Sequence, residues 1–194
     1  KLKATYGLVG NDQIGEDKDR FFYLSQVNAN DSGKGFTFGE YFNYTRNGVS
    51  ISRYEDPFIT WEIGKKMNLG LELNLWNSLE LQVDYFTEHR SNILQERAYI
   101  PTTMGLQATP QANVGKAKGG GIDISLDYNH SFSKNLWASM RGNFTYASSE
   151  YVEYEEPDYS DTPWLSRKGK KISQTWGLVA ERLFLDEEEV KNSP

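Results

Sequence analysis

Two neighbouring stretches of the chain alternate strictly between apolar and polar residues, which is the pattern of a β-strand with one apolar face. Leucines occupy every second position from Leu69 to Leu75, and the alternation resumes from Leu79 to Tyr85. If Leu75 pairs with Leu79, both apolar sets lie on one face of a hairpin. The pattern therefore predicts a three-residue turn, Trp76-Asn77-Ser78.

The same construction recurs later in the chain. Residues 122–128 alternate in the same way, and a second apolar set follows between residues 136 and 146. Pairing Phe132 with Leu136 keeps these two sets on one face and predicts a second three-residue turn, Ser133-Lys134-Asn135. A shorter alternating run near the N-terminus adds one more strand.

The alternating runs divide the chain into strands and loops. We expect about five long strands, near residues 1–10, 61–76, 79–94, 119–132 and 136–152. The stretches between them are rich in Gly, Asn, Asp, Pro and aromatic residues, so we expect loops near residues 11–60, 95–118 and 153–194. One end of the strands thus carries tight turns, and the other end carries long loops.

The unequal loop lengths bear on the fold class. Alternation alone fits a soluble β-sandwich and a membrane barrel equally, but outer-membrane barrels combine short periplasmic turns with long extracellular loops. The expected strands also exceed the usual five or six residues, whereas a tilted barrel strand needs about 9–11 residues inside the membrane. We therefore predict an all-β fold, a segment of a large antiparallel transmembrane β-barrel.

Charges within the expected strands fix which face is which. A lipid-facing charge near the bilayer midplane costs about 2–4 kcal/mol for Lys or Arg and somewhat less for Asp or Glu. Five acidic residues should therefore face the lumen: Glu72, Glu80, Asp84, Asp123 and Asp127. About five strands do not close an even-stranded barrel, and an open edge in lipid leaves amides unpaired, so we expect the chain to be part of a barrel.

Composition excludes several kinds of chemistry. The formal net charge of -6 argues against a nucleic-acid partner, and the absence of cysteine removes thiolate metal sites and cysteine nucleophiles. Only His89 and His130 are available as imidazoles, and no Gly-x-Ser-x-Gly elbow is present. We expect no catalytic residue, no cofactor-binding residue and no metal ligand, so the chain is not expected to be an enzyme.

Two loop features remain as candidate contact sites. The acidic stretch at 150–161 lacks regular ligand spacing, so a solvated loop is favoured over a calcium site, although calcium binding stays an open alternative. Loop aromatics are suited to stacking on sugar rings or packing against a partner protein, or they only hold their own loops together. These candidate residues are Phe36, Phe38, Tyr41, Phe42, Tyr44 and Trp164.

Several strings resemble a known family over almost the whole chain. They include Tyr6-Gly7-Leu8-Val9-Gly10-Asn11, Trp61-Glu62, Asn68-Leu69-Gly70-Leu71-Glu72, Val83-Asp84-Tyr85-Phe86, Asn113-Val114-Gly115-Lys116 and Pro163-Trp164-Leu165. Together they resemble the C-terminal barrel portion of the SusC-like family of TonB-linked outer-membrane transporters. Gly119 and Asp123 stand where that family has Asn and Glu, and Ser173 and Arg182 stand where it has glycines.

The resemblance implies a large barrel in the cell outer membrane that is closed by a plug domain and energised through TonB. It implies import of glycan or peptide fragments, which are captured with a SusD-like surface lipoprotein. We expect these residues to supply barrel wall and loops in contact with outer-membrane lipid, and we expect neither the plug domain nor a TonB-contacting segment among them. The alternative is a soluble all-β carbohydrate-binding or adhesion module, with the apolar faces packed against a second sheet.

Overall fold

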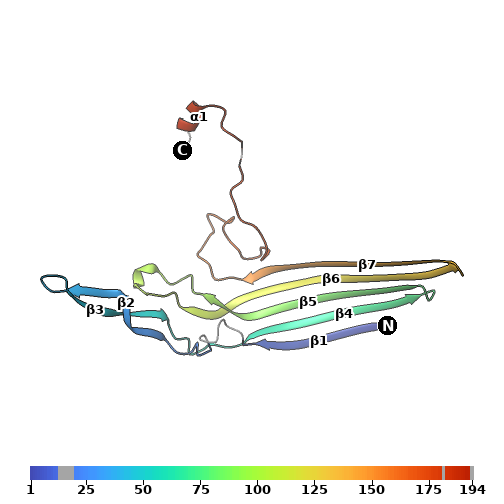
Figure 1. The fold of residues 1–194 in the computed structure, drawn as a ribbon, viewed down its shortest axis with the longest axis horizontal. Helices are drawn as coiled ribbons and strands as arrows, with labels where there is room; N and C mark the ends of the chain where they lie inside the picture. Colours follow the sequence, from blue (N-terminus) through green and yellow to red (C-terminus); the bar gives the residue numbers. More distant parts are fainter. Residues whose placement is uncertain (13–19, 181, 193–194) are drawn as a thin grey trace.

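The structure, a computed structural model, describes residues 1–12, 20–180 and 182–192; residues 13–19, 181 and 193–194 of the expected loops lie outside these ranges. Five long strands form one antiparallel sheet in the order β1-β4-β5-β6-β7 (Figure 1). They are β1 (Leu2–Asn11), β4 (Glu62–Leu75), β5 (Leu79–Glu96), β6 (Gln111–Ser133) and β7 (Leu136–Glu153). The sheet is open, with β1 and β7 as its outer strands.

A second, two-stranded sheet lies within the stretch 11–60, where we expected only loop. β2 (Gln26–Phe38) pairs with β3 (Tyr44–Arg53), and this hairpin projects beyond the ends of the long strands (Figure 1). Its register shifts repeatedly, and the side chains of Asn28 and Asp31 accept hydrogen bonds from backbone N–H groups two residues further along. These Asx turns explain why a strand has the composition of a loop.

β6 is longer than expected, because residues 111–118 are strand and not loop. These residues pair with the loop end of β5 through their backbones, and they lie outside the strictly alternating apolar run from which the strand was predicted. The helical segments are short, η2 (Thr102–Met104) and α1 (Glu187–Asn192). Within the described ranges, no helix has the length and apolar character needed to cross a bilayer.

The first predicted turn is confirmed, and the second is wrong in its detail. Leu75 pairs with Leu79 across three residues. In the second hairpin Ser133 pairs with Leu136, which leaves a two-residue turn. Phe132 is then the extra residue of a β-bulge, and the expected register resumes one step further from the turn. The bulge compensates for the shorter turn, so both apolar sets still share one face.

Cross-strand pairing places the apolar residues of neighbouring strands in rows on one face of the sheet. One such row, running from β4 to β7, is Leu71, Val83, Ile124 and Phe144. The next row towards the turns contains Leu73, Leu81 and Leu126, and the row on the other side contains Leu69, Tyr85, Ile122 and Tyr146. The whole apolar band is therefore continuous across four strands.

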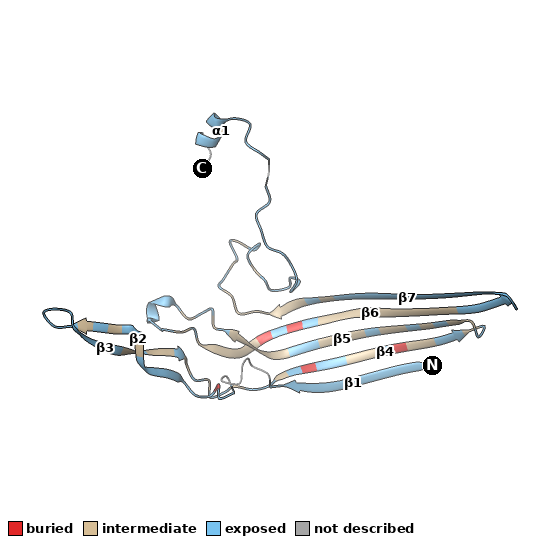
Figure 2. Cartoon of the chain, in the orientation of Figure 1, coloured by how far each residue is buried: buried red, intermediate tan, exposed pale blue. Residues whose placement is uncertain are grey.

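This band is not covered by another protein layer in the part of the chain that the structure describes. Within that part, the buried hydrophobic side chains are Phe22 and Ala117, and most of the sheet is exposed or half-buried (Figure 2). The β2–β3 hairpin lies beyond the strand ends and does not fold back over the sheet (Figure 1). A soluble sandwich needs a second sheet on this face, whereas a membrane barrel needs only lipid.

Candidate functional site

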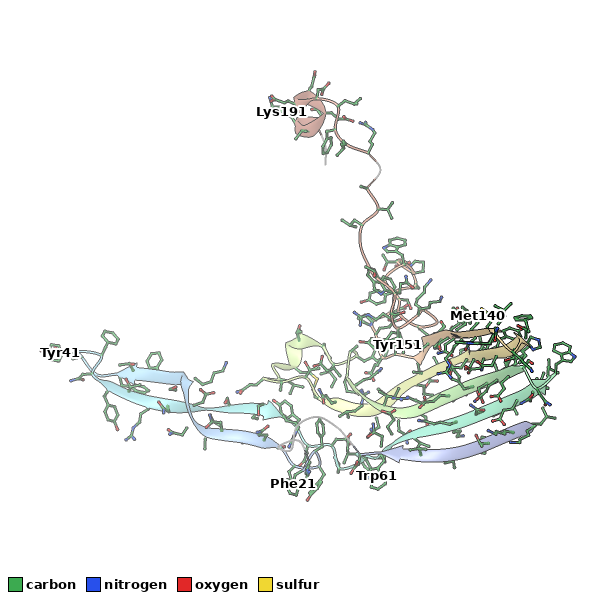
Figure 3. The ribbon with its side chains drawn as sticks, turned by 45° about the vertical axis from the view of Figure 1, so that its right-hand side comes forward. Phe21, Tyr41, Trp61, Met140, Tyr151 and Lys191 are labelled. Carbon is green, nitrogen blue, oxygen red and sulfur yellow. The ribbon has the colours of Figure 1, made fainter. Side chains whose placement is uncertain are left out.

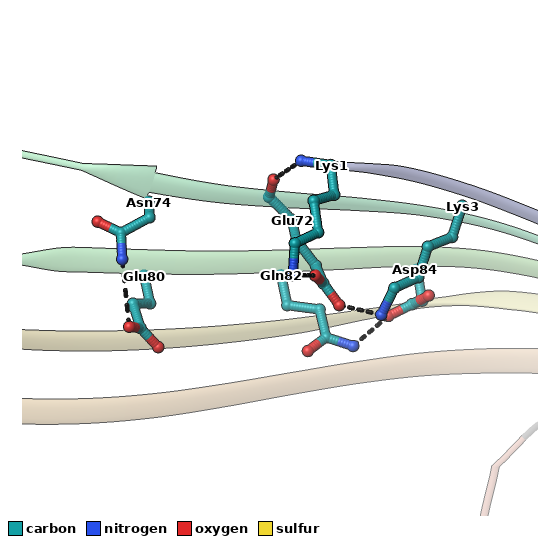
Figure 4. A network of polar contacts seen from close by, with 7 residues as sticks. All are labelled: Lys1, Lys3, Glu72, Asn74, Glu80, Gln82 and Asp84. Atoms are coloured by element: carbon teal, nitrogen blue, oxygen red, sulfur yellow. Dashed lines mark hydrogen bonds and ion pairs between the residues drawn. The ribbon is translucent and has the colours of Figure 1, made fainter. Parts of the chain in front are cut away.

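The face opposite the apolar band is polar, and its side chains form contacts across strands (Figure 4). The Lys3 ammonium of β1 donates to the Glu72 carboxylate of β4, and Lys1 Nζ lies 3.7 Å from the same carboxylate. On β5, Gln82 Nε2 donates to Asp84 Oδ2 over 2.8 Å. This face can offer hydrogen-bond donors and acceptors, and charges of both signs, to water or to a passing solute.

The other four acidic residues predicted to face the lumen lie on this polar face as well. Asp84 stands directly opposite Asp123, and Glu80 stands directly opposite Asp127. Like charges in directly opposed positions destabilise a sheet unless they are compensated. Arg141 compensates one of these negative charges, because its Nε donates to Asp127 Oδ1 over 2.6 Å. The arrangement is compatible with a hydrated lumen and incompatible with hydrocarbon on this face.

Five of the six predicted contact aromatics gather at the end of the β2–β3 hairpin. We call them the aromatic tip: Phe36, Phe38, Tyr41, Phe42 and Tyr44. The rings of Phe36 and Phe38 meet edge to face with centroids 5.1 Å apart, and the Arg46 guanidinium lies 4.8 Å from the centroid of Tyr44. The tip thus combines exposed ring faces with one nearby cation.

The turn of the aromatic tip lies at the far end of the hairpin, where Tyr41 is labelled (Figure 3). Tyr41 and Phe42 are 79 % and 75 % exposed, and Phe42 has a φ of 48°. A left-handed backbone is uncommon for a bulky residue and marks a tight turn or strain, and Trp76 in the turn between β4 and β5 has a φ of 55° as well. Trp164, the sixth predicted residue, lies in the segment after β7, so the structure does not make it part of the tip.

The base of the hairpin is tied to the rest of the chain. The Arg53 guanidinium lies 4.7 Å from the ring centroid of the buried Phe22. The Ile51 N–H donates to Gln107 Oε1 over 2.8 Å, and the Gln107 N–H donates to the Tyr54 hydroxyl over 3.3 Å. Since Gln107 belongs to the β5–β6 loop, the two loops support each other at this point.

Three of the six carboxylates in the acidic stretch at 150–161 form ion pairs with cations of neighbouring segments. The ion pairs are Lys118–Glu150 at 2.7 Å, Lys116–Glu153 at 2.7 Å and Arg97–Glu155 at 2.8 Å. Glu156 Oε2 accepts from the Arg167 N–H over 2.8 Å. In the described residues no three carboxylates or imidazoles converge as a metal site would require. The geometry therefore gives the calcium alternative no support.

A pocket of about 570 Å³ lies between this acidic stretch and the β5–β6 loop. We call it the tyrosine pocket, since its lining includes Tyr99, Tyr154 and Tyr159 together with Lys168. Arg167 donates to the Tyr154 hydroxyl over 3.2 Å and thereby fixes that ring. These tyrosines were not among the predicted contact residues, although they are aromatic residues in stretches that were expected to be loops, as the predicted contacts are.

The two histidines lie far apart on the face of the sheet that carries the apolar band. His89 stands beside Lys118 near the loop end of β5, whereas His130 lies at the turn end of β6. His130 packs between the rings of Tyr128 and Phe132, and its Nδ1 lies 3.0 Å from the Ser78 hydroxyl. These positions do not bring the two imidazoles into one site.

The two-faced sheet, its short turns and its long loops define the wall of an outer-membrane β-barrel. The chain belongs to the family of TonB dependent receptor-like β-barrels, and the match to this family covers residues 24–178. Membership confirms the predicted family, the all-β barrel class and the location in the outer membrane.

The chain is similar to two TonB-dependent receptors of Formosa agariphila. Receptor P3 is 26 % identical over 161 residues, covering 81 % of this chain and 15 % of that receptor. Receptor P39 is 24 % identical over 179 residues, covering 91 % of this chain and 16 % of that receptor. The chain therefore spans only about 15 % of the length of the curated relatives that it matches.

Solved structures of the RagAB peptide importer have a similar fold. The open-open state matches with a TM-score of 0.59 at 26 % identity, covering 79 % of this chain and 15 % of that chain. The closed-closed state matches with a TM-score of 0.60 at 25 % identity, covering 80 % of this chain and 16 % of that chain. The same strands and loops thus occur within a much longer barrel protein.

Proposed function

We propose that this chain forms wall and external loops of an importer that takes up oligosaccharide or peptide fragments with energy delivered through TonB. The observation that carries the proposal is the two-faced sheet, with an apolar band on one side and a polar, charge-paired surface on the other. Such a sheet separates lipid from an aqueous lumen. The role of these residues is to enclose and bind, and it needs no bond-making step.

The remaining parts of the importer belong to the proposal too. A plug domain and a TonB-contacting segment would come from other parts of a protein as long as the relatives, and a SusD-like surface lipoprotein would pack over the loops. The similarity to a peptide importer supports uptake of peptide fragments, and the exposed aromatics of the loops suit sugar rings equally well.

We assign ligand or partner contact to the aromatic tip and the tyrosine pocket. Rigid aromatic rings give large contact area at low conformational cost, which is why they are enriched at binding surfaces. The exposure of Tyr41 and Phe42 at the far end of the hairpin supports this assignment. Trp164 is 65 % exposed and remains a separate candidate contact in the segment after β7.

Variants of the aromatic tip test the proposal in cells that carry the full-length receptor. Tyr41→Ser together with Phe42→Asn removes both exposed rings, and Asn suits the left-handed backbone at position 42. Each lost aromatic contact is worth about 0.5–1.5 kcal/mol, so we expect roughly tenfold weaker capture of labelled peptides or oligosaccharides. The amount of receptor in the outer membrane should not change.

Phe58→Ser is the matched control, since Phe58 is an exposed aromatic, 83 %, that lies outside the tip. We expect uptake by this variant to equal that of the unmodified receptor. Uptake unaffected by the tip variant, or reduced equally by the control, would contradict the assignment of the tip.

A further inference from the structure

A row of one histidine and four charged residues bounds the apolar band on its loop side, on the face that meets lipid. Across the sheet from β4 outward it runs Lys65, His89, Lys118, Glu150 and Lys171, and we call it the lysine row. Each residue is the direct cross-strand partner of the next, so all five side chains are on one face. At about 4.8 Å per strand the row extends about 19 Å.

Alternation fixes the orientation of this row. From Lys118 to Ile124 and Tyr128 the register of β6 is unbroken, so Lys118 points to the same side as the apolar residues. The same holds for Lys65 with respect to Leu71 on β4. The row therefore does not belong to the polar lumen face.

The height of the row matches the upper boundary of a membrane. His89 and Leu79 are ten residues apart on β5, which is about 33 Å along the strand and about 25 Å across a bilayer at a tilt of about 40°. Directly above the row the strands become irregular, with register shifts after Arg90 on β5 and at Lys116 on β6. Asn92, just above the row, has a φ of 58°.

The charge of the row is mainly positive, with three lysines and one glutamate. Lys118 Nζ lies 2.7 Å from Glu150 Oε1, and both side chains remain partly exposed. Lys65 is exposed at the other end of the row. Lysines at the edge of an apolar surface can bury their alkyl chains against lipid and keep their ammonium groups at headgroup level, where they attract anionic groups.

We infer that the lysine row binds the phosphate groups of lipid A, the lipid anchor of lipopolysaccharide. The long loops orient this end of the sheet to the cell exterior. Lipopolysaccharide is the lipid of the outer leaflet of an outer membrane. The span of the row and its three ammonium groups suit a headgroup with two phosphates on a disaccharide. Tyr85 and Tyr146, two rows deeper, lie where acyl chains begin.

The test measures binding of bisphosphorylated lipid A to the purified, delipidated full-length receptor in detergent, with dephosphorylated lipid A as the lipid control. Lys65→Gln, Lys118→Gln and Lys171→Gln combined should weaken binding by about fivefold per lysine, on the order of a hundredfold in total. Lys66→Gln is the matched control, because Lys66 lies 3.7 Å from Glu88 on the lumen face. This control should bind lipid A as the unmodified receptor does.

Glu150→Gln is expected to change lipid A binding in the opposite direction. Removing the one carboxylate of the row should tighten binding of bisphosphorylated lipid A several-fold, a result that misfolding does not produce. The inference is overturned if the triple variant binds lipid A normally, or if Lys66→Gln weakens binding equally. Equal binding of the dephosphorylated lipid by the unmodified receptor also overturns it. If the triple variant does not fold, unchanged affinity of Glu150→Gln decides against the inference.

Discussion

A lysine placed in the middle of the apolar band should destabilise the barrel far more than a lysine one residue away. Val83 lies near the centre of the band, between Leu71 and Ile124. Val83→Lys puts an ammonium near the bilayer midplane, at a cost of about 2–4 kcal/mol. The ratio of folded to unfolded receptor should therefore fall about 30- to 1,000-fold.

The neighbouring position supplies the control. Gln82 is on the polar face directly opposite Glu72, so Gln82→Lys adds the same charge to the lumen and gains an opposite charge across the strand. We expect its effect to stay within about 0.5 kcal/mol. The two variants place the same charge on opposite faces of the sheet, at neighbouring positions in the sequence.

The assay is urea unfolding of the full-length receptor in phospholipid vesicles, followed by tryptophan fluorescence or by the mobility shift of the folded barrel. The reasoning predicts a large fall in the free energy of unfolding for Val83→Lys and almost none for Gln82→Lys. Equal losses for both variants, or a larger loss for Gln82→Lys, would refute the assignment of the two faces.

Two further predictions concern the strand β6 and the hairpin. A Cβ at Gly121 would lie 2.1 Å from a backbone carbonyl oxygen of β7, so Gly121→Ala should lower the free energy of unfolding by about 1–3 kcal/mol. Gly119→Ala is the control, because its Cβ would have its nearest contact at 3.5 Å, and it should leave the result of the same unfolding assay unchanged. In the hairpin, hydrogen bonds from the Ser50 side chain and the Gly33 N–H lower the pKa of Asp31 below its usual 3.8. Because the folded pKa is the lower one, this stabilisation is complete above pH 3.8 and is lost as the pH falls through the folded value. Protection of the Gly33 amide, measured as its exchange rate relative to that of an unstructured peptide at the same pH, should therefore fall only there. Reduced protection already at neutral pH would contradict the prediction.

The long strands were predictable because successive side chains alternate between the two faces of a sheet. The requirement that the apolar residues of neighbouring strands share one face therefore restricts which residues can pair. The pairing of Leu75 with Leu79 followed from the single requirement that both leucine sets share a face, and the structure has that pairing. The same requirement gave the correct register beyond Phe132, even though the turn itself has two residues. The bulge and the shorter turn together leave the register of the remaining strand unchanged, so the apolar pattern cannot reveal either of them.

The parts outside the apolar band were not predictable in the same way. Residues 111–118 and the strands of the β2–β3 hairpin are held by backbone pairing and Asx turns, and neither leaves a period-two pattern. The candidate site was anticipated in part. Phe36 to Tyr44 were named as candidate contacts and are close in sequence, whereas Tyr99 and Tyr154 line one pocket only through the tertiary arrangement of two segments.

The central claim is that the apolar face of the sheet meets lipid while the opposite face meets water. It is tested most directly by spin labels placed one at a time at positions 79–88 of β5 in the full-length receptor in vesicles. The account predicts an oscillation of period two, in which odd positions up to Tyr85 are accessible to oxygen dissolved in lipid and even positions to a water-soluble nickel reagent. Odd positions that are accessible to the nickel reagent, or accessibility without alternation, would contradict the account.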